Sequence, residues 1–113
     1  MECLFCKIVK REIPGDIVYE DDEVLAFNDL NPQAPTHVLV IPKKHIATLN
    51  DIEEDDLATI GRLQYTAAQI AKEKGFADDG YRVVMNCNDM GGQTVYHIHM
   101  HVMGGREFTW PAG

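Results

Sequence analysis

The sequence predicts an α+β fold: a five-stranded antiparallel sheet packed against one long helix, with a short helix at the N-terminus. Three observations lead to this prediction. Short segments rich in β-branched and aliphatic residues recur along the chain, one long stretch has helical periodicity, and turn residues separate the segments. Strands that precede and follow a single main helix are typical of α+β proteins with an antiparallel sheet.

The first half of the chain supplies the opening helix and three strands. Residues 5–11 (FCKIVKR) predict the short helix, which ends near the Pro-Gly pair that follows. Residues 17–20 (IVYE) and 23–29 (EVLAFND) predict two strands joined by an acidic turn, the pattern of a β-hairpin. After a loop with two prolines, residues 37–42 (HVLVIP) predict a third strand.

The long helix is predicted to begin at Asn50 or Asp51 and to end before Gly75. Either residue can cap the helix, and the acidic residues that follow complement the positive end of its dipole. Gly75 suits the left-handed conformation that often ends a helix. Apolar residues at helical spacing mark one buried face: Leu57, Ile60, Leu63, Ala67, Ile70 and Ala71.

The remaining two strands follow the helix. Residues 81–87 (YRVVMNC) predict the fourth strand, and residues 94–103 (TVYHIHMHVM) predict the fifth. Between them, residues 88–93 (NDMGGQ) form a turn in this prediction. The order of elements therefore places the fourth and fifth strands in the same sheet as the first three.

Composition limits the classes of function. A length of 113 residues indicates one domain covering residues 1–113. The net charge of -8 disfavours binding to nucleic acid, and the apolar runs are too short for a membrane span. Three cysteines are an odd number, and no secretory leader opens the chain. A reducing compartment such as the cytoplasm is therefore expected.

Three of the five histidines occupy every second position: His97, His99 and His101. Residues two apart on a strand point the same way, so the three side chains are expected to share one face. A structural role would account for one such histidine. It accounts poorly for three in strict alternation, because histidine is neither a strong strand former nor a good core residue.

Two interpretations of this histidine face are metal binding and nucleophilic catalysis. A single metal ion cannot hold all three, because the outer two lie about 13 Å apart on a strand and metal–nitrogen bonds are about 2.0–2.1 Å. Two of them could converge on one metal. The alternative is nucleophilic catalysis, since neutral imidazole is a nucleophile near its unperturbed pKa of about 6.5. Gly91 and Gly92 precede the strand and can bring backbone N–H groups close to a phosphate.

Residues 97–103 (HIHMHVM) resemble the H-φ-H-φ-H-φ-φ signature of the histidine-triad (HIT) family of nucleotide hydrolases and transferases. The similarity covers nearly the whole chain: residues 7–46 resemble the N-terminal half of the family, and residues 80–113 resemble its C-terminal half. The Gly-Gly-Arg after the triad and the terminal Trp-Pro-Ala-Gly resemble the Hint branch of the family. The branch that hydrolyses dinucleoside polyphosphates typically carries Pro-Arg after the triad instead.

The resemblance implies hydrolysis of purine nucleoside phosphoramidates to AMP through a nucleotidyl-histidine intermediate, with no cofactor needed for the chemistry. His99 would attack the α-phosphorus, and His101 would contact the phosphate. His97 and His37 would support the nucleophile through hydrogen bonds. Thr94 would assist the leaving group, at a position where Hint proteins commonly carry serine; threonine keeps the hydroxyl.

The resemblance also implies a nucleotide-binding set and a homodimer. The set is Asp29, Leu30, Asn86, Gly92, Gln93, Thr94, His99 and His101. Asp29 would hold the ribose hydroxyls, although an Asx-turn before Pro32 accounts for its residue type equally well. Hint members pair into a dimer with a continuous ten-stranded sheet. Their C-termini reach toward the partner's site, where Trp110 is then expected.

Some HIT proteins bind a structural zinc through a C-x-x-C near the N-terminus, a later histidine and the first triad histidine. This chain has the corresponding residues Cys3, Cys6, His45 and His97. Two cysteines and two histidines are a standard tetrahedral zinc set. Hint members usually lack the cysteines, so free thiols on a short helix are the alternative.

Two other functions fit the same sequence. One is a non-catalytic purine-nucleotide-binding or interaction module on the same fold, which would bind AMP without releasing an amine. The other is a metal-dependent hydrolase that uses the histidine strand, which would lose activity on chelation. The complete triad favours the phosphoramidate hydrolase over both.

Overall fold

The computed structural model describes residues 3–113. Its helices are α1 (Leu4–Val9), α2 (Leu57–Lys74) and α3 (Asn88–Gly91), with two 3-10 turns, η1 (Leu49–Asp51) and η2 (Glu54–Asp56). Its strands are β1 (Ile17–Glu20), β2 (Val24–Asn28), β3 (Thr36–Pro42), β4 (Tyr81–Val84) and β5 (Met100–Gly104). None of the helices in this described part combines the length and the hydropathy that a bilayer crossing requires.

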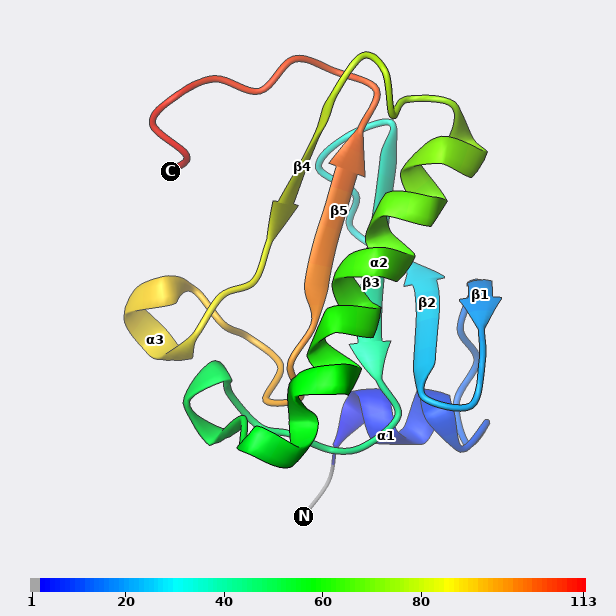
Figure 1. Cartoon of the computed structure of the whole chain (residues 1–113), viewed down its shortest axis with the longest axis vertical. Helices are drawn as coiled ribbons and strands as arrows, with labels where there is room; N and C mark the ends of the chain where they lie inside the picture. The colour runs from blue at the N-terminus through cyan, green and yellow to red at the C-terminus, as the bar shows by residue number, and fades with distance from the viewer. Residues whose placement is uncertain (1–2) are drawn as a thin grey trace.

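The five strands form one antiparallel sheet in the order β1-β2-β3-β5-β4. Figure 1 shows α2 lying along one face of the sheet and α1 near the end of the sheet where β3 finishes. The predicted fold is thereby confirmed: a five-stranded antiparallel sheet, one long helix and a short N-terminal helix. Strands β1 and β4 are the two edges of the sheet.

The sheet is buried on both faces, which is why β2 and β3 read as continuous apolar runs. Alternate residues such as Val24 and Val38 join a core with Leu63 and Ile70 of α2. The intervening residues form a second cluster on the opposite side with two residues of α1: Phe5, Ile8, Leu25, Phe27, Leu39 and Ile41. This second cluster becomes one wall of the candidate active site.

Strand β5 is shorter than predicted. It begins at Met100, and residues 94–99 are irregular. Met100 pairs with Val40, so Ile98 would fall opposite Pro42, where β3 ends. The Ile98 N–H bonds instead to the Ile46 carbonyl (2.8 Å), in the segment that follows β3. The first two triad histidines therefore lie on a bent segment, and the third lies on the strand.

The long helix also begins later than predicted, at Leu57. The acidic residues before it form two 3-10 turns, in which Asp51 accepts hydrogen bonds from Thr48. Asp56 pairs with Lys44 (2.6 Å), so part of the acidic run anchors the loop after β3. Gly75 ends α2 in the left-handed conformation (φ 88°), as predicted. The predicted turn at 88–93 contains the single-turn helix α3.

Candidate active site

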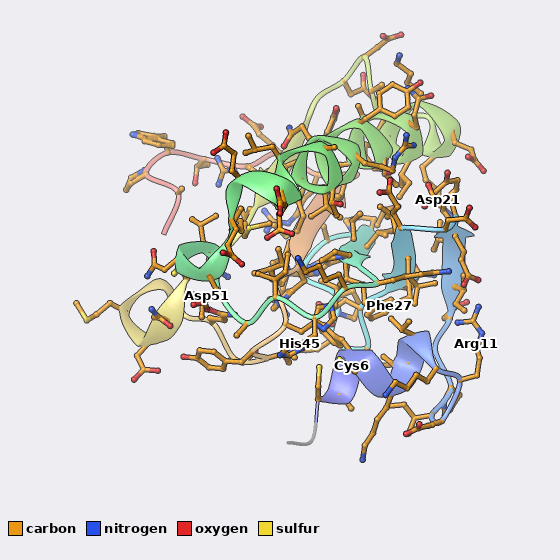
Figure 2. All side chains as sticks on the ribbon, turned by 60° about the horizontal axis from the view of Figure 1, so that its bottom comes forward. Cys6, Arg11, Asp21, Phe27, His45 and Asp51 are labelled. Carbon is orange, nitrogen blue, oxygen red and sulfur yellow. The ribbon has the colours of Figure 1, made fainter. Side chains whose placement is uncertain are left out.

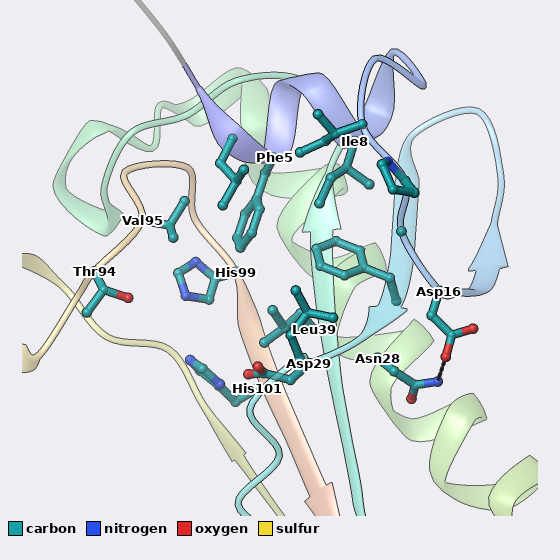
Figure 3. A pocket seen from close by; sticks show the side chains of 16 residues that line it. Phe5, Ile8, Asp16, Asn28, Asp29, Leu39, Thr94, Val95, His99 and His101 are labelled. Atoms are coloured by element: carbon teal, nitrogen blue, oxygen red, sulfur yellow. Dashed lines mark hydrogen bonds between the residues drawn. The ribbon is translucent and has the colours of Figure 1, made fainter.

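A cavity opens between α1, the end of β2 and the start of β5. One side is apolar, with Phe5 and Ile8 from α1, Phe27 from β2 and Leu39 from β3. Phe5 meets Phe27 edge to face, with ring centroids 5.3 Å apart. The opposite side carries polar groups, so the cavity can seat a flat apolar ring beside an anionic group (Figure 3). The polar lining residues include Asp29, Thr94, His99 and His101.

The ring of His99 is held in one tautomer by the backbone. Its Nδ1 lies 2.8 Å from the His97 carbonyl oxygen, which can only accept, so Nδ1 carries the proton. Nε2 therefore keeps its lone pair. Burial lowers the pKa of His99, which keeps the ring neutral, and Phe5 packs edge-on against it at 5.1 Å. A buried, neutral and oriented imidazole is suited to act as a nucleophile.

A hydrogen-bond relay orients His101. The Gln33 backbone N–H donates to His37 Nδ1 (3.0 Å), so the proton of His37 is on Nε2. That Nε2 lies 2.9 Å from His101 Nδ1 and 3.4 Å from Asp29 Oδ2. His101 Nδ1 accepts the closer bond, which leaves the proton of His101 on its Nε2. His101 is therefore a neutral hydrogen-bond donor.

Asp29, His37 and His101 also place potential metal-binding atoms within 4.8 Å of one another. The tautomer of His37 argues against a metal there. A metal ion would need the lone pair of Nε2, but Nδ1 already accepts a backbone hydrogen bond and Nε2 holds the proton. This group of residues is better suited to hydrogen bonding than to metal binding.

A separate group of potential metal ligands, Cys3, Cys6, His45 and His97, lies beside Phe5, whose ring centroid is 6.0 Å from that of His97. The sulfur of Cys3 is 3.3 Å from His97 Nδ1, and the sulfur of Cys6 is 3.4 Å from His45 Nδ1 (Figure 2). Ligand atoms around a tetrahedral zinc lie about 3.3–3.8 Å apart. His97 Nε2 donates to the Pro42 carbonyl (2.7 Å), so Nδ1 presents its lone pair to the cluster. The four residues fit a metal ion.

The triad histidines therefore divide between two sites. The rings of His99 and His101 lie together, with centroids 5.0 Å apart, but the prediction that all three histidines share one face is wrong for His97. The ring of His97 turns to the cysteine cluster instead, because the chain bends before Met100. His97 reaches His99 through its backbone carbonyl, and His37 contacts His101.

The remaining predicted residues are divided between the cavity and its surroundings. Asp29, Leu30 and Thr94 line the cavity, but its lining does not include Asn86, Gly92 or Gln93. Leu30 is exposed at the rim. Asp29 Oδ1 accepts from the Asn31 N–H (2.9 Å), so the Asx-turn considered from the sequence is present, while Oδ2 faces His37. The Asp29 carboxylate thus stabilises the turn and also lines the cavity.

Sequence reasoning missed the apolar wall formed by Phe5, Ile8, Phe27 and Leu39. In sequence these residues are indistinguishable from ordinary core positions. They come from a helix and two strands whose relative placement no local pattern predicts.

A known protein family matches most of this chain. Residues 10–108 match the HIT domain. The chain belongs to the HIT family. The resemblance inferred from the histidine signature is thereby confirmed.

The HIT protein has similar relatives. The purine nucleoside phosphoramidase of Escherichia coli (strain K12) is 56% identical over 105 residues, covering 93% of this chain and 88% of that protein. A HIT family hydrolase from Legionella pneumophila Philadelphia 1 has a TM-score of 0.97 at 54% identity, covering 99% of this chain and all of that one. A zinc-bound histidine triad family protein from Mycobacterium smegmatis has a TM-score of 0.80 at 37% identity, covering 94% of this chain and 76% of that one.

The partly buried histidine His101 predicts a pH-dependent stability of the HIT protein. Burial lowers its pKa to about 4, whereas the unfolded chain binds a proton near pKa 6.5. The free energy of unfolding is therefore highest above pH 6.5 and falls between 6.5 and 4, by on the order of 3 kcal/mol for this group. Urea unfolding at about pH 7 and about pH 4.5 measures the fall. The His101→Gln variant should show a shallower fall, and equal falls in both proteins would contradict this expectation.

Proposed function

We propose that this HIT protein hydrolyses purine nucleoside phosphoramidates to a nucleoside monophosphate, such as AMP, and an amine. The observation that carries the proposal is the fixed tautomer of His99, whose Nε2 lone pair lies in a cavity with an apolar slot. The 56% identity to a protein named purine nucleoside phosphoramidase supports the substrate class. The apolar wall around Phe5 and Phe27 suits the faces of a purine.

The reaction proceeds in two steps on His99. Nε2 attacks the α-phosphorus, the phosphorus–nitrogen bond breaks, and a nucleotidyl-histidine forms. The departing nitrogen keeps the bonding electron pair and takes a proton from the Thr94 hydroxyl, which regains one from water. The resulting hydroxide then attacks the phosphorus, and the electron pair of the histidine–phosphorus bond returns to Nε2.

Other residues bind and orient the nucleotide. His101 donates its Nε2 proton to a phosphate oxygen, and His37 keeps it in that tautomer. Asp29 lines the cavity and accepts from the ribose hydroxyls, and Leu30 covers the rim. The roles of Asn86 and Gly92 in phosphate and nucleoside contacts stay predictions, and the role of Gln93 is taken up below.

A structural zinc bound by Cys3, Cys6, His45 and His97 accompanies this function. The spacing of the four ligand atoms supports it, as does the zinc-bound relative from Mycobacterium smegmatis. When bound, zinc would hold α1 to the segment before β5 and take no part in the chemistry, because four protein ligands close its coordination.

We also propose a homodimer of a single-domain chain that works in the cytoplasm. A continuous ten-stranded sheet needs an unpaired edge on each chain, and β4 is such an edge. Arg82 on β4 donates to the Thr109 carbonyl (2.8 Å), which keeps the C-terminal segment with Trp110 beside that edge. None of the three cysteines forms a disulfide, which fits a reducing compartment.

The test of the function is incubation of the purified protein with adenosine 5'-phosphoramidate. We expect AMP and the amine in equal amounts, and activity that does not depend on added metal. AMP binding without amine release would instead support a binding module. Activity that requires a metal ion at the triad would support a metal-dependent hydrolase.

A further inference from the structure

The side chain of Gln93 is buried (5% exposed) and uses its amide group entirely within the fold. Its Nε2 donates to the Ala47 carbonyl (2.8 Å) and to the Val95 carbonyl (3.0 Å). Its Oε1 accepts from the Asn88 backbone N–H (2.9 Å). Two carbonyls around the nitrogen and one N–H at the oxygen fix the orientation of the amide. Gln93 therefore has no free donor to offer a nucleotide.

These three hydrogen bonds join three separate segments. Ala47 lies between β3 and η1, Asn88 is the first residue of α3, and Val95 lies in the irregular stretch that leads to the triad. The backbone N–H of Gln93 also donates to the Asn88 carbonyl (3.1 Å). The chain on both sides of residue 94 is thus tied to the rest of the fold.

The hydrogen bonds of Gln93 hold the backbone of the next residue, Thr94, in place. The bond from Gln93 to the Val95 carbonyl spans it. Thr94 lines the cavity, whereas the Gln93 side chain is buried and is not part of the cavity lining. Figure 3 shows the Thr94 hydroxyl directed into the cavity on the side of His99 and His101. Between residues 3 and 113 that hydroxyl has no hydrogen-bond partner of its own, so its position depends on where the backbone of Thr94 is held and on its side-chain rotamer.

We propose that Gln93 is a positioning residue that aims the Thr94 hydroxyl at the leaving nitrogen. This inference rests on the proposed phosphoramidase function, in which Thr94 passes a proton to the departing amine. It replaces direct nucleotide contact as the role of Gln93. Loss of the three bonds frees residues 93–95, and a displaced hydroxyl transfers its proton less efficiently.

The experiment compares two leaving groups in Gln93→Met, which has similar length but none of the three bonds. One substrate is an adenosine 5'-phosphoramidate of an alkylamine, which must receive a proton to leave. The other is the p-nitrophenyl ester of AMP, whose phenolate leaves without one. We expect kcat on the phosphoramidate to fall about 10- to 100-fold. We expect kcat on the ester and the affinity for AMP to stay within about twofold of the parent protein.

A double-mutant cycle separates positioning from a general structural role. If Gln93 acts through Thr94, the Gln93→Met change costs nothing further once Thr94→Val has removed the hydroxyl. Gln64→Met, on the exposed face of α2, is the matched control and should leave both substrates unaffected. Should Gln93→Met fail to fold, Gln93→Glu keeps the acceptor for Asn88 and should show the same leaving-group selectivity.

Two results would overturn the role of Gln93. One is an equal loss on both substrates, and the other is an effect that adds fully to that of Thr94→Val. A parent protein that releases no amine from the phosphoramidate overturns the proposed function itself. The two failures are distinguishable because the first is measured in an active enzyme.

Discussion

Replacing His99 with alanine is expected to abolish turnover, lowering kcat by about 10⁴-fold or more, because no other group among residues 3–113 is placed to accept the nucleotidyl group. The nearest imidazole, that of His101, has its Nδ1 occupied by His37 and its Nε2 protonated, so it has no lone pair to attack with. The apolar wall is unchanged in the variant, and AMP should still bind. Single-turnover hydrolysis and calorimetric titration with AMP measure the two properties.

The covalent intermediate supplies the control for this prediction. Rapid acid quenching of the parent protein with substrate should give a mass increase of one nucleotidyl group, located by peptide analysis on His99. The His99→Ala protein should show none. Hydrolysis by that variant at a rate near the parent's, in a preparation free of host enzyme, would refute the mechanism, as would an adduct on another residue.

Replacing Cys6 with serine is the change with the largest expected effect on stability. Serine is a poor zinc ligand, so the metal content should fall from about one zinc per chain toward zero. The free energy of unfolding should fall by roughly 4 kcal/mol, as expected when a metal site is lost. Affinity for adenosine should fall as well, because α1 carries both Cys6 and the wall residues Phe5 and Ile8. Metal analysis, urea unfolding and calorimetry provide the three measurements.

Cys87→Ser is the matched control, because Cys87 lies before α3 and outside the metal-binding group. It should keep the zinc content, the stability and the adenosine affinity of the parent. If Cys6→Ser keeps these properties too, the cysteines are free thiols and the zinc proposal is wrong. If zinc is lost but adenosine affinity is unchanged, α1 keeps its place without the metal.

Much of the fold was predictable because its strands and its main helix have distinct periodicities. The apolar spacing from Leu57 to Ala71 marked α2, and the left-handed Gly75 ended it. The prediction was wrong at the start of α2 and at the start of β5. In both places a long-range contact competes with the local preference: Asp56 pairs with Lys44, and Ile98 bonds to Ile46.

The candidate site was predictable where a pattern of residue types is rare in purely structural segments. Three alternating histidines indicated an imidazole nucleophile, and the similarity to the HIT family extended this to Asp29 and Thr94. The wall around Phe5 could not be found, because an apolar residue that faces a cavity follows the same pattern as one that faces the core.

The sequence by itself determined the fold class, the family and the set of residues proposed for the chemistry, because periodicity and side-chain type are local properties. Only the tertiary structure decided how that set divides into two sites. Cys3 and His97 are 94 positions apart in the sequence, yet their ligand atoms lie 3.3 Å apart. His97 therefore lies with the cysteines and apart from the other two triad histidines. The tautomers of His99 and His101 follow from carbonyl and N–H groups that the folded backbone brings to them. A hydrogen bond depends on where both partners lie in space, and the packing of the whole chain sets that position.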